Sequence, residues 1–237
     1  MRGKGFTFKQ FHIDHSRCAM KVGTDGTLLG AWATLPSDGS ILDIGTGTGL
    51  IAIMAAQRSK NSKITAIDID EDCVLQAREN VAASPWPERI EVIHSALQDF
   101  SPAQKFDCII SNPPYFIDSK LSPDAARSTA RHTATLPFDE LVSGVKRLLA
   151  NDGHFSLILP PPEMERFRSA ARGELFTVKE CHVWSTPTSG VRRIMAELKT
   201  VPLAELPIIE KIIIEENGRH QYSDEYRLLT HDFYLKF

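Results

Sequence analysis

The four residues Asn112-Pro113-Pro114-Tyr115 stand directly after an apolar run, 106–111, that reads as a buried strand. The two prolines fix φ and remove two backbone N–H donors, so nearby carbonyl groups stay free to accept hydrogen bonds. Asn112 adds an amide oxygen, and Tyr115 offers an aromatic face. Such a set is suited to hold a planar amino group with two acceptors, Asn112 Oδ1 and the Pro113 carbonyl, while its ring stacks. These four are candidate catalytic residues, although an isolated Asn-Pro-Pro is also a common turn.

A glycine loop, Gly45-Thr46-Gly47-Thr48-Gly49, follows a predicted strand and precedes a predicted helix. Glycines permit positive φ and let the backbone approach a ligand closely. A dinucleotide fingerprint requires Gly-x-Gly-x-x-Gly, and here Leu50 stands where its last glycine belongs. Asp43, just before the loop, would repel a pyrophosphate but suits a ligand that carries an ammonium group. The loop therefore favours S-adenosylmethionine, whose amino-acid moiety and sulfonium are positive, over a nicotinamide or flavin cofactor.

Two further polar positions follow neighbouring predicted strands. Asp68 ends the strand after the glycine loop and is placed to accept hydrogen bonds from ribose hydroxyls, and Ser95-Ala96 should lie beside an adenine ring. Ligands in open α/β sheets bind outside the carboxyl ends of the strands, so all these loops face one crevice. Methyl transfer to an amino nitrogen there is a one-step displacement that depends on positioning and electrostatics.

Apolar β-branched runs alternate with amphipathic stretches between residues 40 and 159, which predicts a doubly wound α/β sheet. The predicted strands are Ser40–Ile44, Lys63–Ile69, Ile90–His94, Phe106–Ser111 and His154–Leu159. The predicted helices are Leu50–Gln57, Glu71–Ala82 and Phe138–Leu149, with Asp70 as the N-cap of the second.

The flanking segments predict smaller elements. After a polar helix, Glu163–Arg172, two runs joined by a short loop, Phe176–Trp184 and Arg193–Thr200, should pair antiparallel. The tail predicts a hairpin-like Ile208–Glu216 and a helix around Asp224–His231. At the other end, Phe6–Ile13 predicts a small ribbon, followed by a helix that Thr24-Asp25-Gly26 caps. Buried positions in the core are expected for Met20, Trp32 and Met54.

Bulk composition narrows the class of protein. The formal net charge of −3 does not indicate a nucleic-acid partner, so any RNA surface must be a local basic patch. The four scattered cysteines predict reduced thiols in a cytoplasmic protein. No secretory signal and no membrane helix are expected. His12, His15 and Cys18 lack a second ligand pair, so no metal is expected.

Several motifs resemble the bacterial tRNA (adenine-N6)-methyltransferases over nearly the whole chain. Besides the two loops above, the resemblance rests on the segments 8–11, 17–26, 130–133 and 232–237. It implies the Rossmann-like fold of S-adenosylmethionine-dependent methyltransferases, with a mostly parallel seven-stranded sheet and an antiparallel terminal hairpin. It also implies methylation of the adenine 3′ of the anticodon in a valine tRNA. The protein is expected to be a monomer.

The expected organisation is a single methyltransferase domain, 1–237, with an N-terminal ribbon and helix (1–39), a Rossmann-like core (40–200) and a C-terminal extension (201–237). The cofactor contacts that the motifs and the resemblance together predict are Lys21, Gly23, Thr24, Asp25, Asp43, Gly45, Gly47, Gly49, Asp68, Ile69, Ser95, Ala96 and Asn112. Candidate RNA contacts are Lys120, Arg127, Arg131 and His132, and Arg192-Arg193 in the loop before a predicted strand.

Two alternatives stay open at this level. The same chemistry serves guanine N2 in RNA, a DNA adenine or a glutamine amide in a protein, because each offers the same planar amino group. A non-catalytic module that binds the cofactor or RNA would show the same glycine loop.

Overall fold

The computed structural model describes residues 5–18, 20–114 and 136–237. Its strands are β1 (Gly5–Thr7), β2 (His12–Asp14), β3 (Ser40–Ile44), β4 (Lys63–Asp68), β5 (Ile90–His94), β6 (Phe106–Ser111), β7 (Leu149–Leu159), β8 (Phe176–Trp184), β9 (Val191–Lys199) and β10 (Ile208–Ile213). Its helices are α1 (Thr24–Trp32), α2 (Leu50–Arg58), α3 (Glu71–Ala82), the 3-10 turn η1 (Pro87–Arg89), α5 (Phe138–Leu148), α6 (Pro161–Ala170) and α7 (Asp224–Thr230).

A central sheet runs through the part of the chain that the structure describes, in the order β10-β8-β9-β7-β6-β3-β4-β5. Strands β7, β6, β3, β4 and β5 are parallel, whereas β9 is antiparallel to both β7 and β8. The expected α/β fold, mostly parallel sheet and antiparallel β8–β9 pair are therefore confirmed. Because the parallel strands run in one direction, the ends of β3, β4, β5 and β6 meet at one edge of the sheet.

The expected number of seven strands is wrong, because β10 adds an eighth strand to this sheet. The segment Ile208–Glu216 was expected to be hairpin-like, but β10 pairs in parallel with β8 instead. This pairing satisfies backbone groups at the outer edge of β8 that would otherwise stay unpaired. A turn closed by the bridge between Glu215 and Tyr222 follows β10 and leads to α7.

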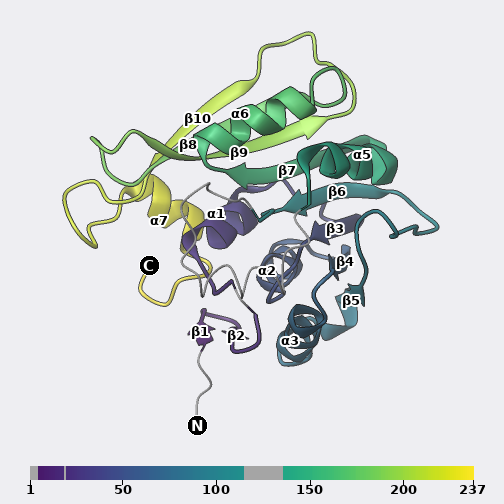
Figure 1. Ribbon diagram of the computed structural model, residues 1–237. Coiled ribbons are helices and arrows are strands. Elements are labelled where there is room, and N and C mark those ends of the chain that lie inside the picture. Colours follow the sequence, from purple (N-terminus) through teal and green to yellow (C-terminus); the bar gives the residue numbers. More distant parts are fainter. Residues whose placement is uncertain (1–4, 19, 115–135) are drawn as a thin grey trace, which may run out of the picture.

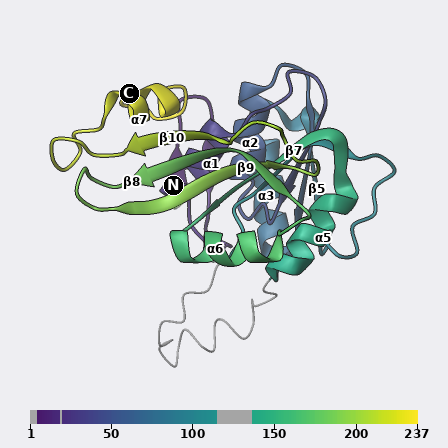
Figure 2. The ribbon, with the colours of Figure 1, turned by 90° about the horizontal axis from the view of Figure 1, so that it is seen from above.

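Helices cover both faces of the sheet: α1, α2 and α3 lie on one side and α5 and α6 on the other (Figure 1). Figure 2 shows α5 and α6 lying along the same face. Successive residues of a strand point to opposite faces, so Ile109 and Ile110 of β6 are fully buried in different core clusters. Trp32 and Met54 are buried as expected. No helix among the described residues has both the length and the apolar character needed to cross a bilayer.

The N-terminal ribbon contacts the C-terminal segment of the chain. The β1–β2 ribbon forms as expected, and the backbone N–H of Lys9 donates to the Phe233 carbonyl at 2.8 Å. The expected cap of α1 is wrong: Thr24, Asp25 and Gly26 form its first turn, and Gly23 is the N-cap. Gly23 lies in an extended conformation with no capping side chain, so the cap position comes from the backbone alone.

Candidate active site

A cavity of about 230 Å³ lies at the carboxyl ends of the parallel strands, where the two predicted loops meet. It brings together residues of the glycine loop, the ends of β4, β5 and β6, and the segments on either side. Its lining residues are Met20, Ile44, Gly45, Gly47, Ile67, Asp68, Ile69, Asp70, Cys73, Ser95, Ala96, Leu97, Gln98, Ser111, Asn112, Pro113, Pro114 and Leu136. The crevice predicted from the two loops is therefore present.

The glycine loop turns under this cavity with three left-handed residues. Gly45, Gly47 and Gly49 have φ of 69°, 56° and 80°. A Cβ added at Gly45 or Gly47 would meet nothing within 4 Å, so these two leave backbone open toward a ligand. At Gly49 the added Cβ would lie 3.3 Å from the Ala77 Cβ, and this glycine does not line the cavity. Gly49 therefore serves the packing of α2 on α3.

Asp68 ends β4 inside the cavity. Its Oδ2 accepts the Gly47 N–H at 2.8 Å, and its Oδ1 accepts the Asp70 N–H at 2.9 Å. Burial raises the pKa of this carboxyl, and the backbone N–H groups of Asp70, Gly47 and Ile69 oppose that shift. Each carboxylate oxygen has two lone pairs, so both retain capacity for a ligand hydroxyl. The ribose contact of Asp68 stays a prediction.

Asp43 lies behind the glycine loop rather than in the cavity lining. Its side chain is 1% exposed, and its Oδ2 accepts the Thr46 hydroxyl at 2.6 Å. Its Oδ1 is buried and has no hydrogen-bond partner among the described residues. Burial, with a smaller contribution from the nearby Asp68 charge, raises the pKa of Asp43 to about 7. A positive ligand above the loop would stabilise the charged form of this carboxyl.

The pKa of Asp43 predicts how the stability of the ligand-free protein depends on pH. The folded-state pKa lies above the unfolded value, so the folded state holds an extra proton between roughly pH 4 and pH 7. The contribution of Asp43 to the free energy of unfolding is fully present at low pH and is lost as the pH rises through 7. We expect the thermal midpoint to fall between pH 5.5 and pH 8.5 more steeply for the wild type than for Asp43→Asn. Calorimetry across this range measures both slopes, and parallel curves would contradict the assignment.

The predicted catalytic loop begins at the end of β6. The Ser111 hydroxyl donates to the Ile44 carbonyl at 2.9 Å, which ties the ends of β6 and β3 together. Asn112 Oδ1 is buried and has no hydrogen-bond partner among the described residues. Pro113 and Pro114 line the cavity beside it, whereas Tyr115 lies outside the described residues. A buried acceptor without a donor can accept a hydrogen bond from a ligand in the cavity.

The remaining predicted cofactor contacts divide into two groups. Ile69, Ser95 and Ala96 line the cavity, and their contact with an adenine stays a prediction. The residues Lys21, Gly23, Thr24 and Asp25 are absent from the lining, although Met20 belongs to it. Asp25 Oδ2 instead accepts a hydrogen bond from Arg193 Nε at 2.7 Å.

The predicted RNA contacts are only partly visible. Arg192 and Arg193 lie within β9 and not in the loop before it, because antiparallel pairing with β8 extends to Val191. Arg192 is exposed, so its RNA contact stays a prediction. The other four candidates, Lys120, Arg127, Arg131 and His132, lie outside the described residues.

Several cavity residues were missed by the sequence interpretation. The core prediction for Met20 is wrong: it is 57% exposed and lines the cavity. Leu97 and Gln98 simply continue the segment after Ser95-Ala96, so extending that loop by two residues would have found them. Cys73 lies in the first turn of α3, and helix position alone would have suggested it. No local pattern indicated Leu136.

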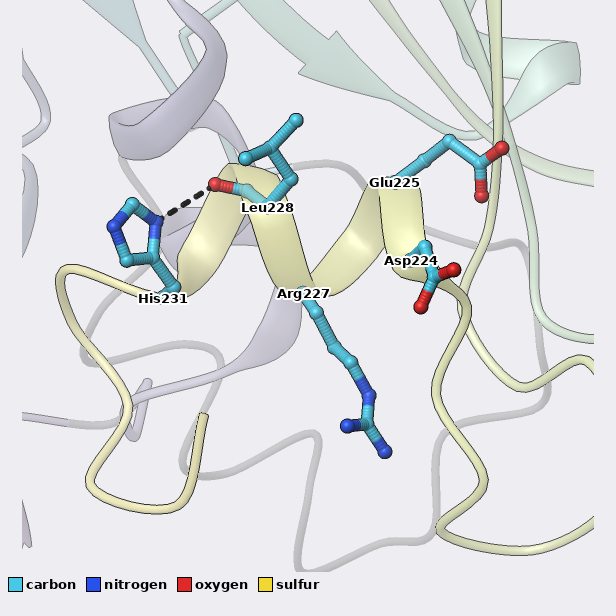
Figure 3. Close-up of a pocket in the computed structure, with 5 residues that line it drawn as sticks. All are labelled: Asp224, Glu225, Arg227, Leu228 and His231. Atoms are coloured by element: carbon cyan, nitrogen blue, oxygen red, sulfur yellow. Dashed lines mark hydrogen bonds between the residues drawn. The ribbon is translucent and has the colours of Figure 1, made fainter.

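A second hollow, of about 450 Å³, lies on the exposed side of α7 (Figure 3). It is lined by Asp224, Glu225, Arg227, Leu228 and His231. His231 Nδ1 is 3.0 Å from the Leu228 carbonyl, a contact within the same helix end. None of the candidate catalytic, cofactor or RNA contacts that the structure describes lines this hollow. The chemistry-bearing groups therefore gather in the first cavity.

Comparison with known proteins agrees with this site. The family model described as Methyltransferase small domain matches residues 18–159. A predicted O-methyltransferase from Agrobacterium tumefaciens has a similar structure, with a TM-score of 0.67 at 19% identity, over 88% of this chain and 96% of that one. A glycopeptide N-methyltransferase in complex with S-adenosylmethionine reaches a TM-score of 0.55 at 13% identity, over 75% of this chain and 95% of that one. The fold and the family match define a methyltransferase.

Relatives with similar sequences show which family of methyltransferases this chain belongs to. A tRNA1(Val) (adenine(37)-N6)-methyltransferase of Phocaeicola vulgatus is 49% identical over 97% of both chains. Enzymes with the same name from Parabacteroides distasonis and Pseudoalteromonas translucida are 47% and 46% identical, each over 98% of this chain and over 98% and 99% of their own lengths. This chain belongs to the family of the tRNA1(Val) (adenine(37)-N6)-methyltransferases.

Proposed function

We propose that this protein transfers the methyl group of S-adenosylmethionine to the N6 amino group of an adenine in tRNA. The observation that carries the chemistry is the buried Asn112 Oδ1 at the end of β6, an acceptor without a donor among the described residues, in the cavity that the glycine loop also lines. An exocyclic amino group supplies the missing donor.

The residues of the cavity fit the proposed cofactor. The open backbone at Gly45 and Gly47 leaves room for a ligand. Asp68 retains acceptor capacity for ribose hydroxyls. Ile69, Ser95 and Ala96 line the same cavity and are proposed to contact the adenine. Asp43 acts from behind the loop: its buried carboxyl gains a favourable interaction when a positive amino-acid moiety binds nearby.

The chemistry is a displacement at carbon. S-adenosylmethionine supplies an electrophilic methyl group: the N–C bond forms as the S–C bond breaks, sulfur keeps that bond's electron pair, and the nitrogen then releases its proton to water. Asn112 Oδ1 accepts one N–H of the amino group, and the Pro113 carbonyl is the proposed second acceptor. Two acceptors orient the nitrogen lone pair toward the methyl group, so positioning and electrostatics supply the rate acceleration.

The choice of tRNA rests on the named relatives, which share 44–49% of their residues with this chain over nearly its full length. Their name indicates adenine 37 of a valine tRNA, and we propose the same substrate here. An anticodon loop presents unstacked bases, so the target base enters the cavity at small energetic cost. Arg192 and the candidates Lys120, Arg127, Arg131 and His132 are proposed to contact its phosphates.

We also propose that residues 1–237 act as one domain, as a monomer in the cytoplasm. Phe8 and Phe233 share a core cluster with Ile53, which supports one domain. Charged residues Glu210 and Lys211 on the edge strand β10 discourage edge-to-edge pairing, which supports a monomer. All four cysteines are free and buried, which suits a reducing compartment.

Product identification tests the proposal. Purified protein is incubated with labelled S-adenosylmethionine and, separately, with unmodified total tRNA, ribosomal RNA, DNA and a protein extract, and the labelled product is digested and identified by mass spectrometry. We expect N6-methyladenosine from tRNA alone. Label in N2-methylguanosine, DNA or glutamine would identify a different substrate from the one proposed. Absence of label would favour a non-catalytic binding module.

A further inference from the structure

The connection between β2 and α1 carries Met20 to the cavity, and it is held at both ends. We define this connection as residues 14–18 and 20–25. Its first part lies along α3, and its last part is the first turn of α1. Met20 lies between these two held ends and lines the cavity.

The first anchor is a pair of buried amide side chains on α3. Asn80 Oδ1 accepts the Asp14 N–H at 3.0 Å, and Asn80 Nδ2 donates to the Asp14 carbonyl at 2.8 Å and to the Thr48 carbonyl in the glycine loop at 2.8 Å. One helical turn earlier, Gln76 Oε1 accepts the Arg17 N–H at 3.2 Å. Gln76 and Asn80 are 1% and 4% exposed, so water does not compete strongly for these bonds. The anchor therefore joins the connection to both α3 and the glycine loop.

The second anchor is the ion pair of Asp25 with Arg193 on β9. Arg193 Nε and Asp25 Oδ2 are 2.7 Å apart, and the two side chains are 30% and 23% exposed. The pair joins the first turn of α1 to a strand 168 residues away. Partial burial and a short charge-assisted bond make it stronger than a fully exposed pair.

Met20 lies between these anchors and is 57% exposed at the cavity. The cavity that it lines also contains Asp68 and Asn112. A large apolar side chain exposed at a cavity wall loses contact with water when a ligand fills the cavity, and this burial favours binding. A connection without anchors would lose conformational entropy when ligand binding orders Met20. The anchors reduce this entropic cost because they order the connection before the ligand binds.

We propose that Met20 is a cofactor-binding residue and that Arg193 is a positioning residue which, together with Gln76 and Asn80, holds Met20 at the cavity. The inference rests on the proposed function because it takes S-adenosylmethionine as the ligand. It assigns Arg193 to cofactor binding instead of the RNA contact that its sequence suggested.

Titration calorimetry with S-adenosylmethionine and no RNA tests this assignment. We expect Met20→Ala to raise Kd about fivefold to tenfold, as the loss of part of one buried apolar side chain implies. Met20→Leu keeps the apolar area and should stay within about twofold of the wild type. Arg193→Gln should raise Kd about threefold to fivefold, with kcat at saturating cofactor retained. Arg193→Lys keeps the charge and should lie between Arg193→Gln and the wild type.

Two exposed control sites are matched to these variants. Leu228→Ala removes a 76% exposed apolar side chain from α7, and Arg172→Gln removes an exposed charge beyond the end of α6. Neither should change Kd. Because Arg193 acts through Met20, the double variant Met20→Ala/Arg193→Gln should weaken binding by less than the product of the two single effects. Unchanged thermal midpoints show that each variant is folded.

Each contrary outcome overturns a defined part of the inference. An unchanged Kd for Met20→Ala removes Met20 from the site. A higher KM for tRNA with an unchanged cofactor Kd in Arg193→Gln would make Arg193 an RNA contact. If the effect of the double variant on Kd equals the product of the two single effects, Arg193 does not act through Met20. Failure of the proposed function has a different signature. The wild type would still bind the cofactor and Met20→Ala would still raise the Kd for the cofactor, but no N6-methyladenosine would form.

Discussion

Replacement of Asn112 by alanine should reduce kcat by about 100-fold to 1000-fold, the range seen when one preorganised hydrogen-bonding group is removed from a transition state. The physical reason is the position of Asn112 Oδ1, which is buried in the cavity, has no donor within the described part of the chain and is therefore available to orient a substrate amino group. Because the glycine loop and Asp68 are untouched, the Kd for S-adenosylmethionine should stay close to that of the wild type. Single-turnover kinetics with tRNA and calorimetry with the cofactor separate the two quantities.

The control for this experiment is Asn61→Ala, which removes the same type of side chain from an exposed position after α2. It should leave both kcat and Kd unchanged. A wild-type kcat in Asn112→Ala would contradict the catalytic role, and an equal loss in Asn61→Ala would attribute the effect to the fold. The conservative variant Asn112→Asp keeps an acceptor and should retain more turnover than alanine does.

Replacement of Asp68 by alanine should raise the Kd for S-adenosylmethionine about tenfold to 100-fold. The carboxylate is proposed to accept ribose hydroxyls, and hydrogen bonds to a charged group contribute about 1.5–3 kcal/mol. It also accepts the Gly47 N–H at 2.8 Å, so its loss loosens the glycine loop as well. Asp68→Asn keeps a neutral acceptor and should fall between alanine and the wild type. Calorimetry in the absence of RNA gives all three values.

The matched control is Asp72→Ala, which removes an exposed carboxylate four residues further along the chain, in the first turn of α3. Its effect on Kd should be below about twofold, since exposed charges contribute little. Equal weakening in Asp68→Ala and Asp72→Ala would assign the effect to the general electrostatic field of the α3 end. An unchanged Kd in Asp68→Ala would remove this residue from the ribose site.

Much of the fold could be predicted because its signals are local. The strands Ser40–Ile44, Ile90–His94, Phe106–Ser111 and Phe176–Trp184 have the predicted bounds, as does the helix Glu71–Ala82. The N-cap of that helix, Asp70, accepts the backbone N–H groups of Asp72 and Cys73, two and three residues away. Interactions of this kind depend on neighbours in the sequence, so residue types at fixed spacing predict them.

The position of the active site could also be predicted from local motifs and one rule of topology. Gly45, Gly47 and Asn112 each follow a parallel strand, and the carboxyl ends of parallel strands meet at one edge. The residues around them were harder to place. Asp43 precedes the glycine loop by two residues, but only the packed structure shows that it lies behind the loop with a pKa near 7.

By itself, the sequence determined the doubly wound core, the glycine loop with its helix, and the acceptor at Asn112. Each of these features lies within one segment of the chain, where the spacing of apolar, glycine and capping residues encodes it. Only the tertiary structure decided that β10 pairs with β8, that Arg193 pairs with Asp25 and that Met20 lines the cavity. These contacts join segments far apart in the chain. Their formation depends on strand register and on the packing of whole layers, and no local pattern of residues records either.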